Sequence, residues 1–191
     1  IKNKASLLLY VLVTSCILYS CSHLSTDKNV NIWPGFRGIN CSGIAEAEQD
    51  PPVFFSPDKN VLWRIAIPGG LSSPCIWGKS IFITGVDTAN KLLKMFCINR
   101  INGKIRGVRD KKVEKFEEVN SFSSPATATP ATDGNRVYFY FSSFGLLCYD
   151  YEGELQWEMP ITLEISQHGM CTSTIVTGDL VILNCFGHWN D

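Results

Sequence analysis

The sequence lacks a surplus of either charge. Its 191 residues include 17 Lys and Arg against 18 Asp and Glu, and charged residues make up only 18% of the chain, below the roughly 25% of an average globular domain. Binding to a phosphate backbone requires a concentrated basic surface, so we expect no nucleic-acid partner. Hydrophobic residues amount to 45% and aromatic residues to 12%, which is enough for a packed core.

The signatures of several enzyme classes are also absent. The chain has no Gly-x-Ser-x-Gly elbow, phosphate loop or dinucleotide fingerprint, and no Cys-x-x-Cys pair. Of its three histidines, His168 has no partner at catalytic or metal-binding spacing, and we interpret it as a loop residue with a structural hydrogen bond. The sequence therefore predicts no catalytic, cofactor-binding or metal-binding residue.

The first residues have the layout of an export signal. Lys2 and Lys4 precede an apolar run over residues 5–19, which is shorter than the roughly 20 residues of a membrane-spanning helix. Leu18-Tyr19-Ser20-Cys21 resembles the bacterial lipobox, although Tyr19 stands where a small residue is usual. Val13-Thr14-Ser15-Cys16 also fits, but cleavage there would leave a second apolar stretch behind.

These features divide the chain into three parts. We expect a lipoprotein signal peptide over residues 1–21, a polar tether over 22–31 and the folded body over 32–191. Lipidation of Cys21 would attach several acyl chains and anchor the protein stably to a membrane. We therefore expect an exported lipoprotein of the cell envelope that lies in the outer membrane or faces the periplasm. An ordinary cleaved signal or a membrane anchor is the alternative.

Six cysteines remain after this assignment. An exported compartment permits disulfides, but several of the six have apolar neighbours on predicted strands, and free cysteine is among the most buried residue types. We therefore favour a packing role for them and leave their disulfide state open. They are Cys41, Cys75, Cys97, Cys148, Cys171 and Cys185.

Three blocks of the chain, residues 61–85, 123–150 and 155–185, share one outline. Each has small hydroxyl residues, a short apolar stretch, a turn and an apolar strand. The turn glycines Gly78, Gly134 and Gly178 lie 56 and 44 residues apart, close to the roughly 40–50 residues of a four-stranded propeller blade.

The local patterns predict strands and tight turns. Residues 79–85, 91–100, 104–108 and 135–141 are rich in β-branched, aromatic and other apolar residues bounded by turn signals. Asn102-Gly103 predicts a hairpin, and Glu152-Gly153 the corresponding one. The charged run over 109–120 is interpreted as a solvated loop. With no amphipathic helix of four turns, the predicted fold class is all-β.

Two similar stretches, "CINRINGKIRG" over residues 97–107 and "CYDYEGELQW" over 148–157, occupy the same place in successive units. We interpret Asn99 and Asp150 as turn residues whose side chains accept hydrogen bonds from nearby backbone N–H groups. Trp63 and Trp157 are predicted to pack between neighbouring units. A structural role is favoured over ligand binding.

These stretches resemble the Ala-x-Asp-x-x-x-Gly-Lys-x-x-Trp repeat of the pyrroloquinoline-quinone-like β-propellers. Gly107 stands where the repeat has Trp, and the second copy is one residue shorter. "WPGFRGINCSG", residues 33–43, resembles the entry segment of exported propellers of this type. The resemblance implies four-stranded blades docked through Trp stacking. It implies about three blades of a six- to eight-bladed ring, in a chain truncated at its C-terminal end.

The resemblance leaves two functions open. The first is a non-catalytic, envelope-anchored scaffold that binds proteins or glycans and needs no cofactor. The alternative is an alcohol or sugar dehydrogenase that depends on pyrroloquinoline quinone and calcium, with its active site in the missing part. The chain has no adjacent Cys-Cys pair of the kind that sandwiches the quinone, which favours the scaffold.

Overall fold

The computed structural model describes residues 31–45, 50–161 and 172–185. The predicted signal peptide, Cys21 and almost all of the tether lie outside the described residues, as do Cys171 and His168. In the part that is described, no helix is long and apolar enough to cross a membrane.

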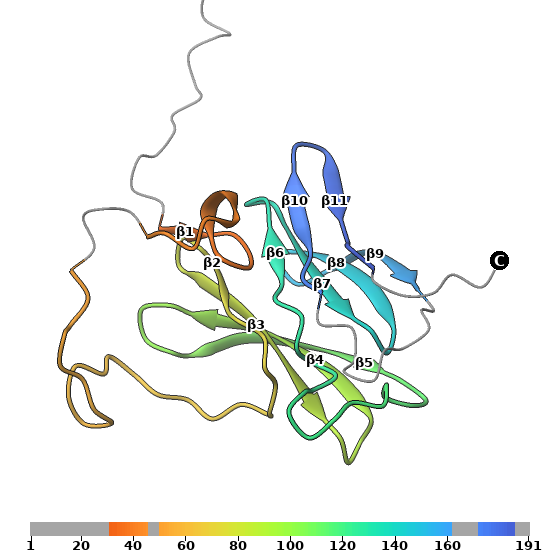
Figure 1. The fold of residues 1–191 in the computed structure, drawn as a ribbon, viewed down its shortest axis with the longest axis horizontal. Coiled ribbons are helices and arrows are strands. Elements are labelled where there is room, and N and C mark those ends of the chain that lie inside the picture. Colours follow the sequence, from red (N-terminus) through yellow and green to blue (C-terminus); the bar gives the residue numbers. More distant parts are fainter. Residues whose placement is uncertain (1–30, 46–49, 162–171, 186–191) are drawn as a thin grey trace, which may run out of the picture. The chain divides into compact units, whose positions relative to one another are not determined.

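The described chain forms three antiparallel sheets (Figure 1), and the all-β prediction is confirmed. Each sheet keeps its strands in chain order, and none of the sheets is closed. The only helical element among the described residues is the single turn η1 (Ile39–Cys41). The five-stranded sheet comprises β1 (Ile32–Trp33), β2 (Cys75–Trp77), β3 (Ser80–Asp87), β4 (Leu92–Asn99) and β5 (Ile105–Lys112). The four-stranded sheet comprises β6 (Ala131–Thr132), β7 (Arg136–Phe141), β8 (Gly145–Asp150) and β9 (Leu155–Pro160), and the two-stranded sheet β10 (Ile175–Thr177) and β11 (Leu180–Ile182).

The burial pattern along the strands shows which faces are covered. In β3 and β4 buried residues largely alternate with partly exposed ones, as expected for strands with one well-covered face. By contrast, β7 is buried at every residue after Arg136, and β8 at every residue before Asp150. Such continuous burial requires cover on both faces of the four-stranded sheet.

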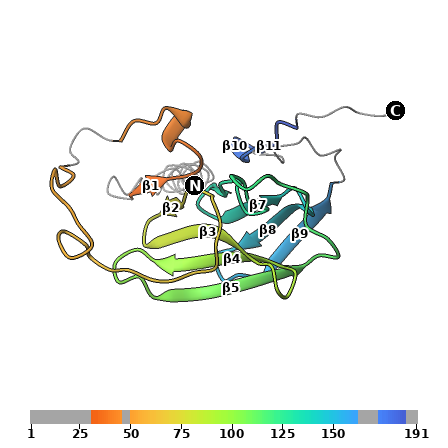
Figure 2. The ribbon, with the colours of Figure 1, turned by 60° about the horizontal axis from the view of Figure 1, so that its bottom comes forward.

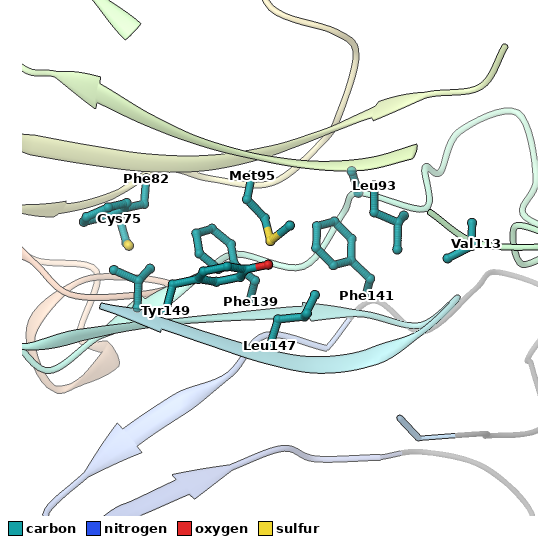
Figure 3. Close-up of a cluster of buried hydrophobic side chains, with 11 residues drawn as sticks. Cys75, Phe82, Leu93, Met95, Val113, Phe139, Phe141, Leu147 and Tyr149 are labelled. Atoms are coloured by element: carbon teal, nitrogen blue, oxygen red, sulfur yellow. The ribbon is translucent and has the colours of Figure 1, made fainter. Parts of the chain in front are cut away.

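Two hydrophobic clusters provide that cover. The first fills the space between the five-stranded and four-stranded sheets, where side chains of β3 and β4 point toward those of β7 and β8 (Figure 3). The second joins the opposite face of the four-stranded sheet to the segment that follows β11. Figure 2 shows β3, β4 and β5 following one another beside β7, β8 and β9. The first cluster contains Cys75, Phe82, Leu93, Met95, Val113, Ala126, Val137, Phe139, Phe141, Leu147 and Tyr149.

The turn glycines lie where the repeat places them. Gly78, Gly134 and Gly178 follow the first strand of their respective hairpins and have φ of 57°, 92° and 54°. This left-handed region disfavours residues with a Cβ. Each unit thus reverses direction at the same point of its repeat.

The prediction of a solvated loop over residues 109–120 is wrong in its first part. β5 continues to Lys112, and Val113 and Glu117 are buried. Two charged residues of β5 are paired with other strands: Lys94 Nζ lies 2.7 Å from Asp110 Oδ1, and Lys111 Nζ lies 2.8 Å from Glu158 Oε2. These partners are distant in sequence, so the run resembles a solvated loop until the strands are paired.

Candidate functional site

Hydroxyl side chains link the three units at equivalent positions. Ser73, Thr129 and Ser173 each lie five residues before the turn glycine of their unit. The backbone N–H of Ser73 donates to Thr129 Oγ1 at 3.1 Å, and the backbone N–H of Thr129 donates to Ser173 Oγ at 3.1 Å. The same interaction therefore joins the first unit to the second and the second to the third. The constant spacing is a signal in the sequence from which this role could have been predicted.

Trp63 docks on the hairpin between β4 and β5. Its indole N–H donates to the carbonyl of Arg100 at 2.9 Å. The ring lies directly against Gly103, where a Cβ would approach Trp63 Cε3 to 2.6 Å. Only a glycine leaves room for this ring, so the turn residue and the tryptophan form one contact.

Asn99 and Asp150 use their side chains inside their own hairpins. Asn99 Oδ1 accepts the backbone N–H of Ile101 at 2.8 Å, and Asp150 Oδ1 accepts that of Glu154 at 2.8 Å. Asp150 Oδ2 also accepts a hydrogen bond from the Gln156 side chain at 2.8 Å. These contacts shape the two turns and occupy carboxylate and amide oxygens that a ligand would otherwise meet.

Gly107 and Trp157 are equivalent positions in the two sheets. Gly107 lies four residues after Gly103, and Trp157 lies four residues after Gly153. Each pairs with a cysteine of the neighbouring strand, Gly107 with Cys97 and Trp157 with Cys148. The register of both strand pairs shifts immediately after that cysteine. Trp157 packs against the second hydrophobic cluster, with its ring 6.0 Å from that of Tyr138.

At Gly107, by contrast, an added Cβ would meet no atom within 4 Å. Cys97, its partner in the ladder, packs against the first cluster. Because residues paired across a sheet share a face, a side chain at position 107 would point toward the four-stranded sheet. The position equivalent to Trp157 therefore has no side chain in the five-stranded sheet, and the space in front of it is open.

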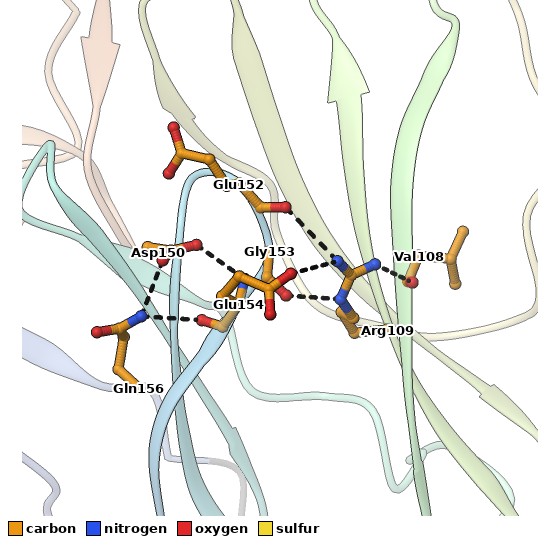
Figure 4. Close-up of polar contacts among 7 residues, drawn as sticks. All are labelled: Val108, Arg109, Asp150, Glu152, Gly153, Glu154 and Gln156. Atoms are coloured by element: carbon orange, nitrogen blue, oxygen red, sulfur yellow. Dashed lines mark hydrogen bonds and ion pairs between the residues drawn. The ribbon is translucent and has the colours of Figure 1, made fainter.

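Arg109 contacts the hairpin between β8 and β9, at the carbonyl groups of Glu152 and Gly153 (Figure 4). It lies two residues after Gly107 along β5, so it projects from the same face. Its Nε–H donates to the carbonyl of Gly153 at 2.6 Å, and its Nη2 lies 2.7 Å from where a Cβ on Gly153 would be. Trp63 makes the corresponding contact with Gly103. The contact of Arg109 with the hairpin was not predicted, because the charged run over residues 109–120 favoured a loop.

A cavity of about 410 Å³ lies between the two sheets, beside Gly107 and Arg109. Phe82 and Met95 line it from the five-stranded sheet, and Phe139 and Tyr149 from the four-stranded sheet. Its volume falls within the roughly 300–1,000 Å³ typical of small-molecule sites. The position at which Gly107 lacks a side chain thus lies beside a cavity of the size that small molecules occupy.

Arg106 also lines this cavity. Its Nη1 donates to Ser80 Oγ at 3.1 Å, and the residue is otherwise largely exposed to solvent. Arg109, by comparison, donates to three carbonyl groups, those of Val108, Glu152 and Gly153. The two arginines therefore differ: Arg109 is engaged with the protein, and Arg106 keeps free donors.

The thiols near the sheets are not activated nucleophiles. Burial raises the pKa of Cys97, against a lowering influence of Arg106 and Ser80, and it raises the pKa of Cys148 to about 11. Both groups are therefore protonated at neutral pH. Cys75 and Cys148 are buried as a packing role requires, but Cys41 is exposed, so that prediction is wrong for Cys41.

Within residues 31–45, 50–161 and 172–185, no three His, Cys, Asp or Glu side chains are grouped so as to hold a metal ion. No protein-family model, curated protein or solved structure matches this chain.

Proposed function

We propose that the three sheets are successive blades of a β-propeller with pyrroloquinoline-quinone-like repeats. Strands β2–β5 form the first described blade, β6–β9 the second, and β10 and β11 begin the third, while β1 belongs to the entry segment. The proposal rests on the hydroxyl contacts from Ser73 to Thr129 and from Thr129 to Ser173, which repeat in the same register. A repeat protein stacks equivalent units through equivalent interfaces, as these contacts do.

The function we propose for this body is a non-catalytic scaffold that binds proteins or glycans in the cell envelope. Large aromatic side chains on its surface support this role: Phe122 is 90% exposed, Phe54 75% and Phe55 76%. Aromatic residues are enriched at the interfaces between proteins relative to the rest of the surface. The repeated polar side chains, in contrast, are used in turns and between sheets.

Anchoring through Cys21 is the second part of the proposal. In cells fed a palmitate analogue, we expect the wild-type protein to be labelled and fractionated with membranes, because Cys21 carries the acyl chains. Cys21→Ala should abolish the labelling and release the protein from the membrane fraction. Equal labelling of the variant would contradict lipidation at this residue.

Site-specific photo-crosslinking in cells tests the scaffold. A photoreactive amino acid at position 122 should yield one discrete adduct with an envelope protein or glycan, and the same group at Glu154, an exposed acidic residue, serves as the control. No adduct, or the same adducts from both positions, would contradict a binding role for the Phe122 surface.

A titration of the full-length protein with pyrroloquinoline quinone and Ca²⁺ addresses the dehydrogenase. Under the scaffold proposal, tryptophan fluorescence stays unchanged throughout the titration. Saturable quenching that requires calcium would refute the non-catalytic proposal in favour of the dehydrogenase.

A further inference from the structure

We propose that the cavity beside Gly107 binds a planar aromatic carboxylate the size of an indole ring. The first reason is the repeat itself. Trp63 lies on the hairpin of Gly103, and Trp157 packs against the second cluster from the position equivalent to Gly107. Where Gly107 interrupts this pattern, the space remains as a cavity of about 410 Å³. This inference needs only the five-stranded and four-stranded sheets and does not depend on the propeller.

The walls of the cavity suit an aromatic ring. Phe82, Met95 and Phe139 present buried apolar surface, and each is at most 4% exposed. Phe139 and Tyr149 lie edge to face, with ring centroids 6.2 Å apart. Aromatic rings favour such edge-to-face and offset arrangements, and thioethers make favourable contacts with rings. A flat aromatic body would therefore find partners on both sheets.

Arg106 selects the carboxylate. Among the described residues its guanidinium has one hydrogen-bond partner, Ser80 Oγ, and no described acidic side chain forms an ion pair with it. A guanidinium has five N–H donors in a planar fork that matches a carboxylate. Asp150 and Glu152 also line the cavity, but the oxygens of Asp150 already accept hydrogen bonds from Glu154 and Gln156, and the Glu152 carboxylate points away from Arg109 (Figure 4). Arg106 therefore offers more free donors at the cavity than Arg109, whose guanidinium donates to three carbonyl groups.

Calorimetric titration of the full-length protein with indole-3-acetate, and with indole for comparison, tests the proposal. We expect saturable binding of indole-3-acetate to the wild type. Gly107→Trp should abolish it, because the new side chain fills the cavity from within. The matched variant Gly107→Ala adds only a Cβ in open space and should bind within twofold of the wild type. Arg106→Gln should weaken indole-3-acetate by about tenfold and leave indole unchanged.

The proposal is overturned if neither probe binds at millimolar concentration, or if Gly107→Trp binds indole-3-acetate as the wild type does. A second measurement covers a Gly107→Trp variant that fails to fold. In the wild-type protein labelled at methionine methyl groups, nuclear Overhauser effects should connect the indole protons of the ligand to Met95, which lines the cavity. Binding without any contact to Met95 would place the ligand elsewhere and refute the assignment.

Discussion

Replacing Gly103 with alanine should destabilise the protein through two separate effects. Gly103 has φ of 69°, and an L-residue in this left-handed region costs roughly 1–2 kcal/mol. In addition, the new Cβ would lie 2.6 Å from Trp63 Cε3, which is too close for two non-bonded carbon atoms. The indole must therefore leave the hairpin.

The second cost follows from what Trp63 loses. Its N–H bond to the Arg100 carbonyl contributes about 1 kcal/mol. Complete removal of a buried tryptophan costs about 3–5 kcal/mol, and Trp63 is only half-buried and merely displaced, so its packing loss is about 1 kcal/mol or less. Together with the backbone term, we expect Gly103→Ala to lower the free energy of unfolding by about 2–4 kcal/mol.

Two controls separate the backbone cost from the loss of the Trp63 contact. The free energy of unfolding is measured in urea, with far-UV circular dichroism as the signal. Gly107→Ala, in the adjoining strand, meets no atom within 4 Å and has no left-handed φ, so it should be neutral or stabilise by about 0.5–1 kcal/mol. In a Trp63→Ala background the cost of Gly103→Ala should fall to its backbone part of about 1–2 kcal/mol. An unchanged cost in that background would refute the docking contact, and equal costs at both glycines would refute the whole argument.

Three further predictions concern single side chains. Arg109→Lys keeps the charge but loses the Nε–H bond to the neighbouring hairpin, and should lower the free energy of unfolding by about 1 kcal/mol in urea; equal stability would contradict the docking role. Burial alone raises the pKa of Asp133, but hydrogen bonds from backbone N–H groups and Tyr138 lower it overall from 3.8. The ionised Asp133 therefore stabilises the fold above pH 3.8, and this contribution is lost as the pH falls through the lower folded-state pKa. Asp133→Asn should remove that loss and so flatten the acid side of the stability–pH curve. An unchanged acid side would refute this. Iodoacetamide at pH 8 should modify exposed Cys41 before buried Cys148, whose pKa burial raises to about 11; peptide mapping showing the reverse order would contradict the placement of these thiols.

Turns and strands were predictable because their causes are local. A glycine after a short apolar stretch, as at Gly78 or Gly134, marks a left-handed turn whatever lies around it, since only glycine enters that region without strain. Likewise, the β-branched and aromatic residues of β3 and β7 favour an extended backbone. The structure extends β3 two residues beyond the predicted segment and otherwise keeps its place.

The role of β5 was not predictable in the same way. Arg109, Asp110 and Lys111 form a charged run that, taken alone, is typical of a solvated loop. Their partners are supplied by other strands: Asp110 pairs with Lys94, and Lys111 with Glu158, 47 residues further along the chain. Contacts between segments so far apart exist only after the strands have paired and the sheets have stacked.

The cavity beside Gly107 depends both on the sequence and on the packing of the two sheets. The sequence alone shows that Gly107 and Trp157 are equivalent positions, because the two copies can be aligned on Gly103 and Gly153. It does not reveal whether the space at Gly107 closes, since that depends on how far the neighbouring sheet can approach. Here the two sheets are held apart by the large side chains of the first cluster and are joined at the edge by Arg109. Close-packed walls cannot collapse into the space, and a missing side chain becomes a cavity.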